Sequence, residues 1–214
     1  TDTLTVSCAI AKDQGTMAFE TANYDLTYGD VNFTNGIIQH GDNDIRFVSS
    51  DPRVAEVQYY TGEVTIKGVG TCTITAMMQE HKNFKKQEAN ITFTVTVAAR
   101  EITADNVTVG EQGENGVPEI TVSVEAPIGI LTPAETTDYQ LAYYDNPEDR
   151  NTVTVEQMLA APGEYVAVLT FFGNYAGYVE KTITVGSAQG PIPGDVNAGG
   201  DVEPEDVDKF ITNI

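Results

Sequence analysis

The stretch from 49 to 76, SSDPRVAEVQYYTGEVTIKGVGTCTITA, constrains the fold more than any other part of the chain. Two short apolar runs flank a turn at Thr61-Gly62, and polar and apolar residues then alternate from 71 to 76. Alternation places successive side chains on opposite faces of a strand, and no helical period is present. The stretch therefore predicts half-buried antiparallel strands joined by tight turns.

The same pattern continues on both sides of this stretch. The segment from Leu4 to Ile10 alternates as a strand, and ITFTVTV at 91–97 places apolar residues on one face and threonines on the other. Strands that recur about every 8–12 residues, separated by turn residues, are typical of a β-sandwich. We therefore expect residues 1–98 to form one such domain.

Several short motifs in this region follow one another in a fixed order. They are Ser49-Ser50-Asp51-Pro52, Val54-Ala55, Val57, Gly62-Glu63-Val64-Thr65, Gly70-Thr71 and Thr73-Ile74-Thr75-Ala76. The series resembles the bacterial immunoglobulin-like group 2 family over residues 30–98, with departures at Cys72 and at Tyr59-Tyr60. The resemblance implies a non-catalytic immunoglobulin-like module that serves cell-surface adhesion or acts as a spacer.

Residues 99–186 repeat the strand pattern and predict a second domain. EYVAVLTFF at 164–172 is apolar on both faces, which favours a central strand. Asn83-Phe84 and Asn174-Tyr175 lie 91 residues apart, each between a strand that follows a glycine and a last strand rich in threonine. The GNYAG stretch at 173–177 resembles repeats of bacterial surface proteins. The predicted fold class is thus all-β, with tandem immunoglobulin-like β-sandwiches.

The remainder of the chain predicts a linker at 187–194 and a short loop–helix segment at 195–214. Asp195, Asn197 and Asp206 occupy positions 1, 3 and 12 of an EF-hand-like calcium loop, with a glycine at position 6. Apolar residues then recur at helical spacing from Val207 to Ile214. The candidate metal ligands are Asp195, Asn197, Asp201 and Asp206.

This segment resembles one half of a dockerin module. The resemblance implies calcium as a cofactor and a cohesin-like partner that binds the C-terminal helix. A complete dockerin has two such repeats, and Gly199 stands at position 5, where an oxygen ligand is expected. The alternative is a degenerate tail whose helix packs on the second domain.

The chain has 32 acidic and 11 basic residues, which give a net charge of −21. This charge excludes nucleic acid as a partner and disfavours anionic membrane surfaces, because both require clustered lysine and arginine. No apolar run reaches the roughly 18 residues of a membrane-spanning helix, so no membrane insertion is expected. The acidity suits a secreted, extracellular protein.

Two cysteines are present. Cys8 shares its face of the predicted strand with Leu4, Val6 and Ile10, and Cys72 shares its face with Ile74. Both are therefore expected in the core of the first domain. Free thiols are favoured over a disulfide, because buried free cysteine is common.

Few residues suggest chemistry. His40 and His81 lie in polar loops without a nucleophile motif, so surface histidines are expected. The candidate ligand-binding residues are Tyr59, Tyr60, Tyr143 and Tyr144. Exposed aromatic rings stack on sugars or peptides, although most such rings on a β-sandwich belong to the core or cover an edge.

These observations favour a non-enzymatic, extracellular adhesion or spacer protein of a bacterial surface. Its expected partner is a surface protein or a polysaccharide. Two alternatives remain open. One is a carbohydrate-binding accessory region of a secreted glycan-degrading protein, and the other is a component that assembles through the dockerin-like segment.

Overall fold

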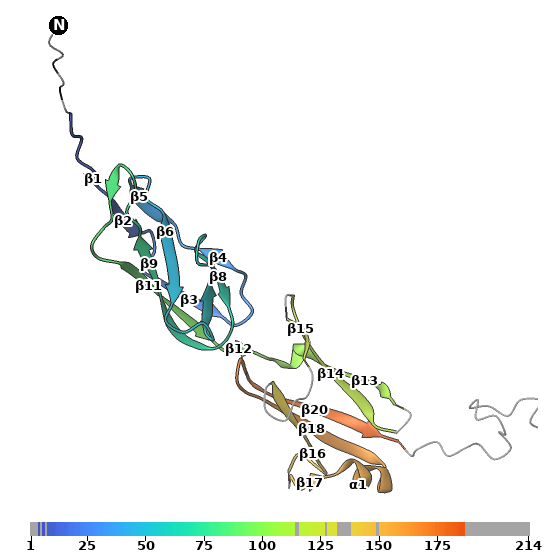
Figure 1. Ribbon diagram of the computed structural model, residues 1–214. Helices are drawn as coiled ribbons and strands as arrows, with labels where there is room; N and C mark the ends of the chain where they lie inside the picture. Colours follow the sequence, from blue (N-terminus) through green and yellow to red (C-terminus); the bar gives the residue numbers. More distant parts are fainter. Residues whose placement is uncertain are drawn as a thin grey trace, which may run out of the picture. The chain divides into compact units, whose positions relative to one another are not determined.

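The structure is a computed structural model that describes residues 4, 6, 8–113, 116–126, 128–131, 138–148 and 150–186. These residues form β-strands with one short α-helix, so the predicted all-β class is confirmed (Figure 1). The chain divides into two compact units. Unit 1 comprises Thr1–Glu101, Glu125–Ile128 and Phe172–Ala176, and unit 2 comprises Ile102–Val124, Gly129–Phe171 and Gly177–Ile214.

Unit 1 is built around a four-stranded sheet with the order β3-β11-β9-β6. β9 pairs antiparallel with β11 and β6, whereas β3 pairs parallel with β11. Smaller sheets of the order β4-β8-β7, β2-β5, β1-β10 and β12-β19 complete the unit. Its strands are β1 (Asp13–Gln14), β2 (Thr16–Phe19), β3 (Asn23–Thr27), β4 (Phe33–Thr34), β5 (Ile37–His40), β6 (Ile45–Ser49), β7 (Ala55–Val57), β8 (Glu63–Ile66), β9 (Gly70–Met78), β10 (Phe84–Lys85), β11 (Ile91–Ala98), β12 (Arg100–Glu101) and β19 (Tyr175–Ala176).

The core of unit 1 follows the alternation that the sequence predicted. On β11, Phe93, Val95 and Val97 are buried while the intervening threonines face outward. The Phe93 ring contacts three aromatic rings, with centroid distances of 4.7 Å to Phe19, 5.6 Å to Tyr24 and 6.4 Å to Phe33. Burial of apolar area and these edge-to-face contacts stabilise the sandwich.

The prediction that Leu4 to Ile10 is a strand of this core is wrong. Leu4, Val6 and Ile10 are exposed by 88%, 78% and 92%, and Cys8 is exposed as well. Alternation shows that a segment can pair, but it does not say which sheet it joins. In unit 1 the four-stranded sheet is completed by β11 and does not include the N-terminal segment. The described residues before β1 pair with no strand.

Unit 2 contains two sheets, with the orders β17-β16-β18-β20 and β13-β14-β15. β18 lies between β16 and β20 and is buried on both faces from Tyr165 to Leu169, as expected for a central strand. The elements of unit 2 are the 3-10 helix η1 (Ala104–Asn106), β13 (Val107–Gln112), β14 (Pro118–Val124), β15 (Gly129–Leu131), β16 (Tyr139–Tyr144), β17 (Thr152–Val153), helix α1 (Val155–Ala160), β18 (Gly163–Phe171) and β20 (Tyr178–Val185).

The short helix α1 was not predicted from the sequence. A capping box begins it: the Thr154 hydroxyl accepts from the Gln157 backbone N–H at 3.2 Å, and the Gln157 side chain accepts from the Thr154 backbone N–H at 2.8 Å. Met158 anchors the helix, because its side chain is fully buried in the core of unit 2.

The predicted calcium loop and its helix, with Asp195, Asn197, Asp201 and Asp206, lie outside the described residues. Within the described part of the chain, no helix is long and apolar enough to cross a membrane.

The two thiols are expected to differ sharply in reactivity. Cys8 is exposed, whereas Cys72 is 3% exposed and burial raises the pKa of its thiol. A thiol reagent should therefore modify Cys8 at least about a hundredfold faster than Cys72 in the folded chain. Titration with a chromogenic disulfide reagent should count one fast thiol in buffer and two in denaturant. Two fast thiols in buffer would contradict the buried position of Cys72.

Candidate functional site

The turn between β7 and β8 carries Tyr59 and Tyr60, which are exposed by 46% and 65%. The Gln58 side chain holds the turn, because its Oε1 accepts from the backbone N–H groups of Tyr60 and Thr61, both at 2.6 Å. The Gln58 backbone oxygen accepts from the Gly62 N–H at 3.0 Å. Both rings are thus presented from a hydrogen-bonded turn.

Gly62 and Phe47 fix this turn on the sheet. Gly62 adopts φ +73°, a conformation that side chains other than glycine disfavour, and a Cβ atom there would lie 2.8 Å from the Phe47 ring. The Phe47 backbone N–H donates to the Tyr59 carbonyl at 3.0 Å. The turn therefore lies against β6 at a defined position.

Arg46 of β6 joins the two tyrosines. Its guanidinium carbon lies 4.8 Å from the centroid of the Tyr60 ring and 5.9 Å from that of Tyr59. The two rings meet edge to face, with centroids 4.9 Å apart and planes at 90°. The guanidinium also donates to the Asp44 carboxylate at 3.2 Å and to the Ile45 carbonyl at 2.9 Å. We call Arg46, Tyr59 and Tyr60 the tyrosine–arginine patch.

The patch combines apolar ring faces with phenol and guanidinium hydrogen-bonding groups. Such a combination can stack on a sugar ring or a planar peptide group and donate to its oxygens. Val48, exposed by 40%, points to the same side of β6 as Arg46 and extends the apolar area. The sequence predicted Tyr59 and Tyr60 as candidate ligand-binding residues, but it did not predict Arg46 as a third member of the site. The signal was available, because Ile45 and Phe47 point inward and Arg46 must then point outward.

Tyr143 and Tyr144, the second pair of candidate tyrosines, lie on β16 of unit 2. Tyr143 packs against the core of unit 2, and burial raises the pKa of its hydroxyl. Tyr144 is half-buried on the opposite face of the strand. Neither ring is presented as fully as Tyr60, so a ligand-binding role for this pair stays a prediction.

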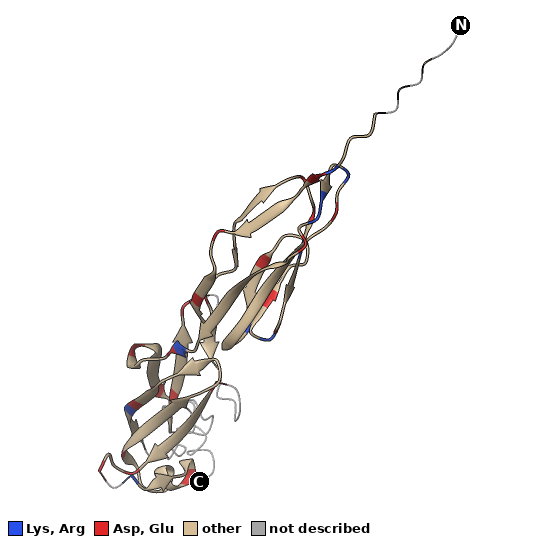
Figure 2. Ribbon diagram, turned by 90° about the vertical axis from the view of Figure 1, so that its left-hand side faces the viewer, with Lys and Arg blue, Asp and Glu red and all other residues tan. Residues whose placement is uncertain are grey.

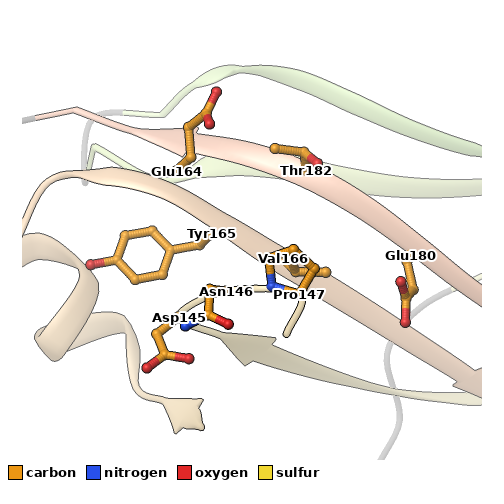
Figure 3. Close-up of a pocket in the computed structure, with 8 residues that line it drawn as sticks. All are labelled: Asp145, Asn146, Pro147, Glu164, Tyr165, Val166, Glu180 and Thr182. Atoms are coloured by element: carbon orange, nitrogen blue, oxygen red, sulfur yellow. The ribbon is translucent and has the colours of Figure 1, made fainter. Parts of the chain in front are cut away.

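A shallow hollow of about 490 Å³ in unit 2 contains three carboxylates, those of Asp145, Glu164 and Glu180. Figure 3 shows them pointing away from one another. Asp145 accepts from the Asn151 side chain at 3.0 Å, and Glu180 accepts from Tyr178 and Arg150. These hydrogen bonds lower the pKa values of Asp145 and Glu180, so both stay ionised. Neither resembles a general acid held protonated near neutral pH.

The histidines are paired with aspartates on the surface of unit 1. His40 Nε2 lies 3.2 Å from Asp13 Oδ2, and His81 Nδ1 lies 2.9 Å from Asp42 Oδ1. Asp and Glu are spread over strands and turns of both units (Figure 2). Among the residues that the structure describes, no group of His, Cys, Asp and Glu is arranged to hold a metal ion.

Comparison with protein families gives a match to part of the chain. A family model described as "Intimin, immunoglobulin-like domain" matches residues 39–78. This match supports a bacterial immunoglobulin-like domain. The matched stretch runs from β5 through β9 of unit 1 and includes the tyrosine–arginine patch. A search of curated proteins gives no significant match.

Several solved structures show distant similarity. Domains 1–6 of the surface layer protein SbsC are 13% identical with a TM-score of 0.32, and the alignment covers 81% of this chain and 26% of that chain. Mouse cadherin-23 EC22–24 is 13% identical with a TM-score of 0.31, covering 83% of this chain and 67% of that chain. Human protocadherin-24 EC1–2 is 11% identical with a TM-score of 0.27, covering 82% and 99%.

Proposed function

We propose that the chain is a non-catalytic, extracellular adhesion module of a bacterial cell surface. The observation that carries this proposal is the match of residues 39–78 to the intimin immunoglobulin-like domain, which lies on the strands of unit 1. The motif series from Ser49 to Ala76 supports a finer assignment of unit 1 to the group 2 immunoglobulin-like family.

The tyrosine–arginine patch is the proposed ligand contact. It is the exposed aromatic group that the matched stretch itself contains, and its hydrogen-bonded turn lowers the entropy cost of ordering the rings on binding. The proposed ligand is a surface protein or a polysaccharide. Adhesion and spacing are compatible, because the patch occupies the edge strand β6 and the turn between β7 and β8 and leaves the other strands free of that role.

Binding to purified ligands tests the adhesive role. The chain should bind members of a glycan array or a panel of extracellular proteins, and Tyr60→Ala or Arg46→Ala should weaken that binding at least about tenfold. The loss is expected because each substitution removes a ring face or the guanidinium that stacks on it. Tyr178→Ala in unit 2 is the matched control, since Tyr178 is also exposed by 52%.

Equal losses for Tyr60→Ala and Tyr178→Ala would contradict the patch as the contact. Binding to glycans alone would favour the alternative of a carbohydrate-binding accessory region. Assembly through the dockerin-like segment, with calcium at Asp195 and its neighbours, rests on residues outside the described part of the chain and stays a prediction from sequence.

A further inference from the structure

The N-terminal segment presents an apolar face to solvent. Leu4, Val6 and Ile10 are exposed by 78–92%, and Cys8, between Val6 and Ile10 on the same face, is exposed too. Side chains two residues apart lie on one face of an extended strand. Large apolar side chains that are exposed together in one segment mark a surface that another protein surface covers.

The sequence of this segment indicates what that surface is. Residues 2–9, DTLTVSCA, align without gaps with residues 91–98, ITFTVTVA, which form β11. Four positions are identical, and three of the others are conservative: Leu4 for Phe93, serine for Thr96, and Cys8 for Val97. β20 ends with the same pattern, TITV at 182–185. The last long strand of each unit, β11 in unit 1 and β20 in unit 2, therefore alternates threonine with apolar residues.

The strands that follow the two aligned segments also correspond. β11 is followed by β12, which pairs parallel with β19 directly after Asn174. The N-terminal segment is followed by β1, which pairs parallel with β10 directly after Asn83. The N-terminal segment therefore precedes β1 in the same way that β11 precedes β12. Since β11 is the last long strand of a sandwich, the N-terminal segment holds the corresponding position in the sequence.

We propose that the segment from Leu4 to Ile10 is the closing strand of a further immunoglobulin-like sandwich whose own sheet lacks that strand. In the docked strand, Leu4, Val6 and Cys8 face the partner's core, as Phe93, Val95 and Val97 face the core of unit 1. A second copy of this chain is not the partner, because its two units already hold β11 and β20 in the closing position.

Protection of the Cys8 thiol tests this proposal. Alkylation of Cys8, followed by peptide mass spectrometry, is compared between the purified 214-residue chain and the protein on the surface of the cells that make it. We expect Cys8 to react at least about tenfold more slowly on the cells, and Leu4→Asp to remove that difference. Labelling in denaturant confirms that the thiol is intact.

The double variant Cys8→Ser, Ala9→Cys is the matched control. Ala9 aligns with Ala98, which is exposed on β11, so the moved thiol should react equally fast in both settings. Equal reactivity of Cys8 in both settings would overturn the proposal. Sedimentation of the purified chain gives a second measurement. A dimer that Leu4→Asp abolishes would also overturn it, by making a second copy the partner.

Discussion

Replacing Phe93 with alanine is expected to lower the free energy of unfolding of unit 1 by about 3–5 kcal/mol. Phe93 is 3% exposed and contacts the rings of Phe19, Tyr24 and Phe33. Its removal leaves a cavity between the sheets that these rings cannot fill without leaving their own positions. A loss of this size is a large part of the stability of a domain of this length.

Denaturant-dependent labelling of Cys72 measures this effect within unit 1. Cys72 lies on β9 and pairs with Val95 on β11, so its exposure reports opening of the sheet that holds Phe93. Thr92→Ala is the matched control, because Thr92 neighbours Phe93 but faces solvent, and a change within about 0.5 kcal/mol is expected. Similar denaturation midpoints for the two variants would show that the contacts of the Phe93 ring do not contribute measurably to the stability of unit 1.

Gly62→Ala is expected to destabilise unit 1 by about 2–4 kcal/mol. The positive φ of +73° costs an alanine about 1 kcal/mol, and the added Cβ, 2.8 Å from the Phe47 ring, costs about 1–3 kcal/mol as overpacking. Relief of that contact moves either the core ring or the turn. The substitution should therefore also lower the affinity of any ligand that binds the tyrosine–arginine patch.

Hydrogen exchange resolved by peptide measures the Gly62 effect on β6 and β8. Gly129→Ala separates the two causes, since Gly129 has a φ of +82° but no atom within 4 Å of an added Cβ. It should therefore show only the backbone cost of about 1 kcal/mol, read in β14 and β15 of unit 2. Equal destabilisation by the two substitutions would mean that the Phe47 ring moves away from the added Cβ atom without a loss of stability.

Alternation predicted the strands well where a single sheet face decides burial. β9 and β11 are the clearest cases, because every second residue is buried along both. The same rule failed for the segment from Leu4 to Ile10, since periodicity describes a face and not the partner that covers it. Helix α1 was not predicted, because six residues are too few to show a helical period. The Thr154-x-x-Gln157 spacing, which is typical of a capping box, nevertheless indicates where the helix begins.

The candidate site was predicted in part. Tyr59 and Tyr60 departed from the family pattern, and the structure places both in the exposed turn. Arg46 could not be joined to them from the sequence, because the contact depends on how the turn between β7 and β8 lies against β6. Tyr143 illustrates the opposite case: a tyrosine in a strand was a candidate, but the pleat directs its ring to the core.

The parallel pairing of β3 with β11 has a mechanical consequence. These strands lie near opposite ends of unit 1 in the sequence and are aligned from Asn23↔Thr94 to Thr27↔Ala98. A pulling force that reaches β3 from its N-terminal end and β11 from its C-terminal end acts along the two strands in opposite directions, so the bonds between them are loaded in shear and share the force. Strands pulled apart from one end would instead lose their bonds one at a time. The pairing of β3 with β11 therefore resists tension that is applied along these two strands.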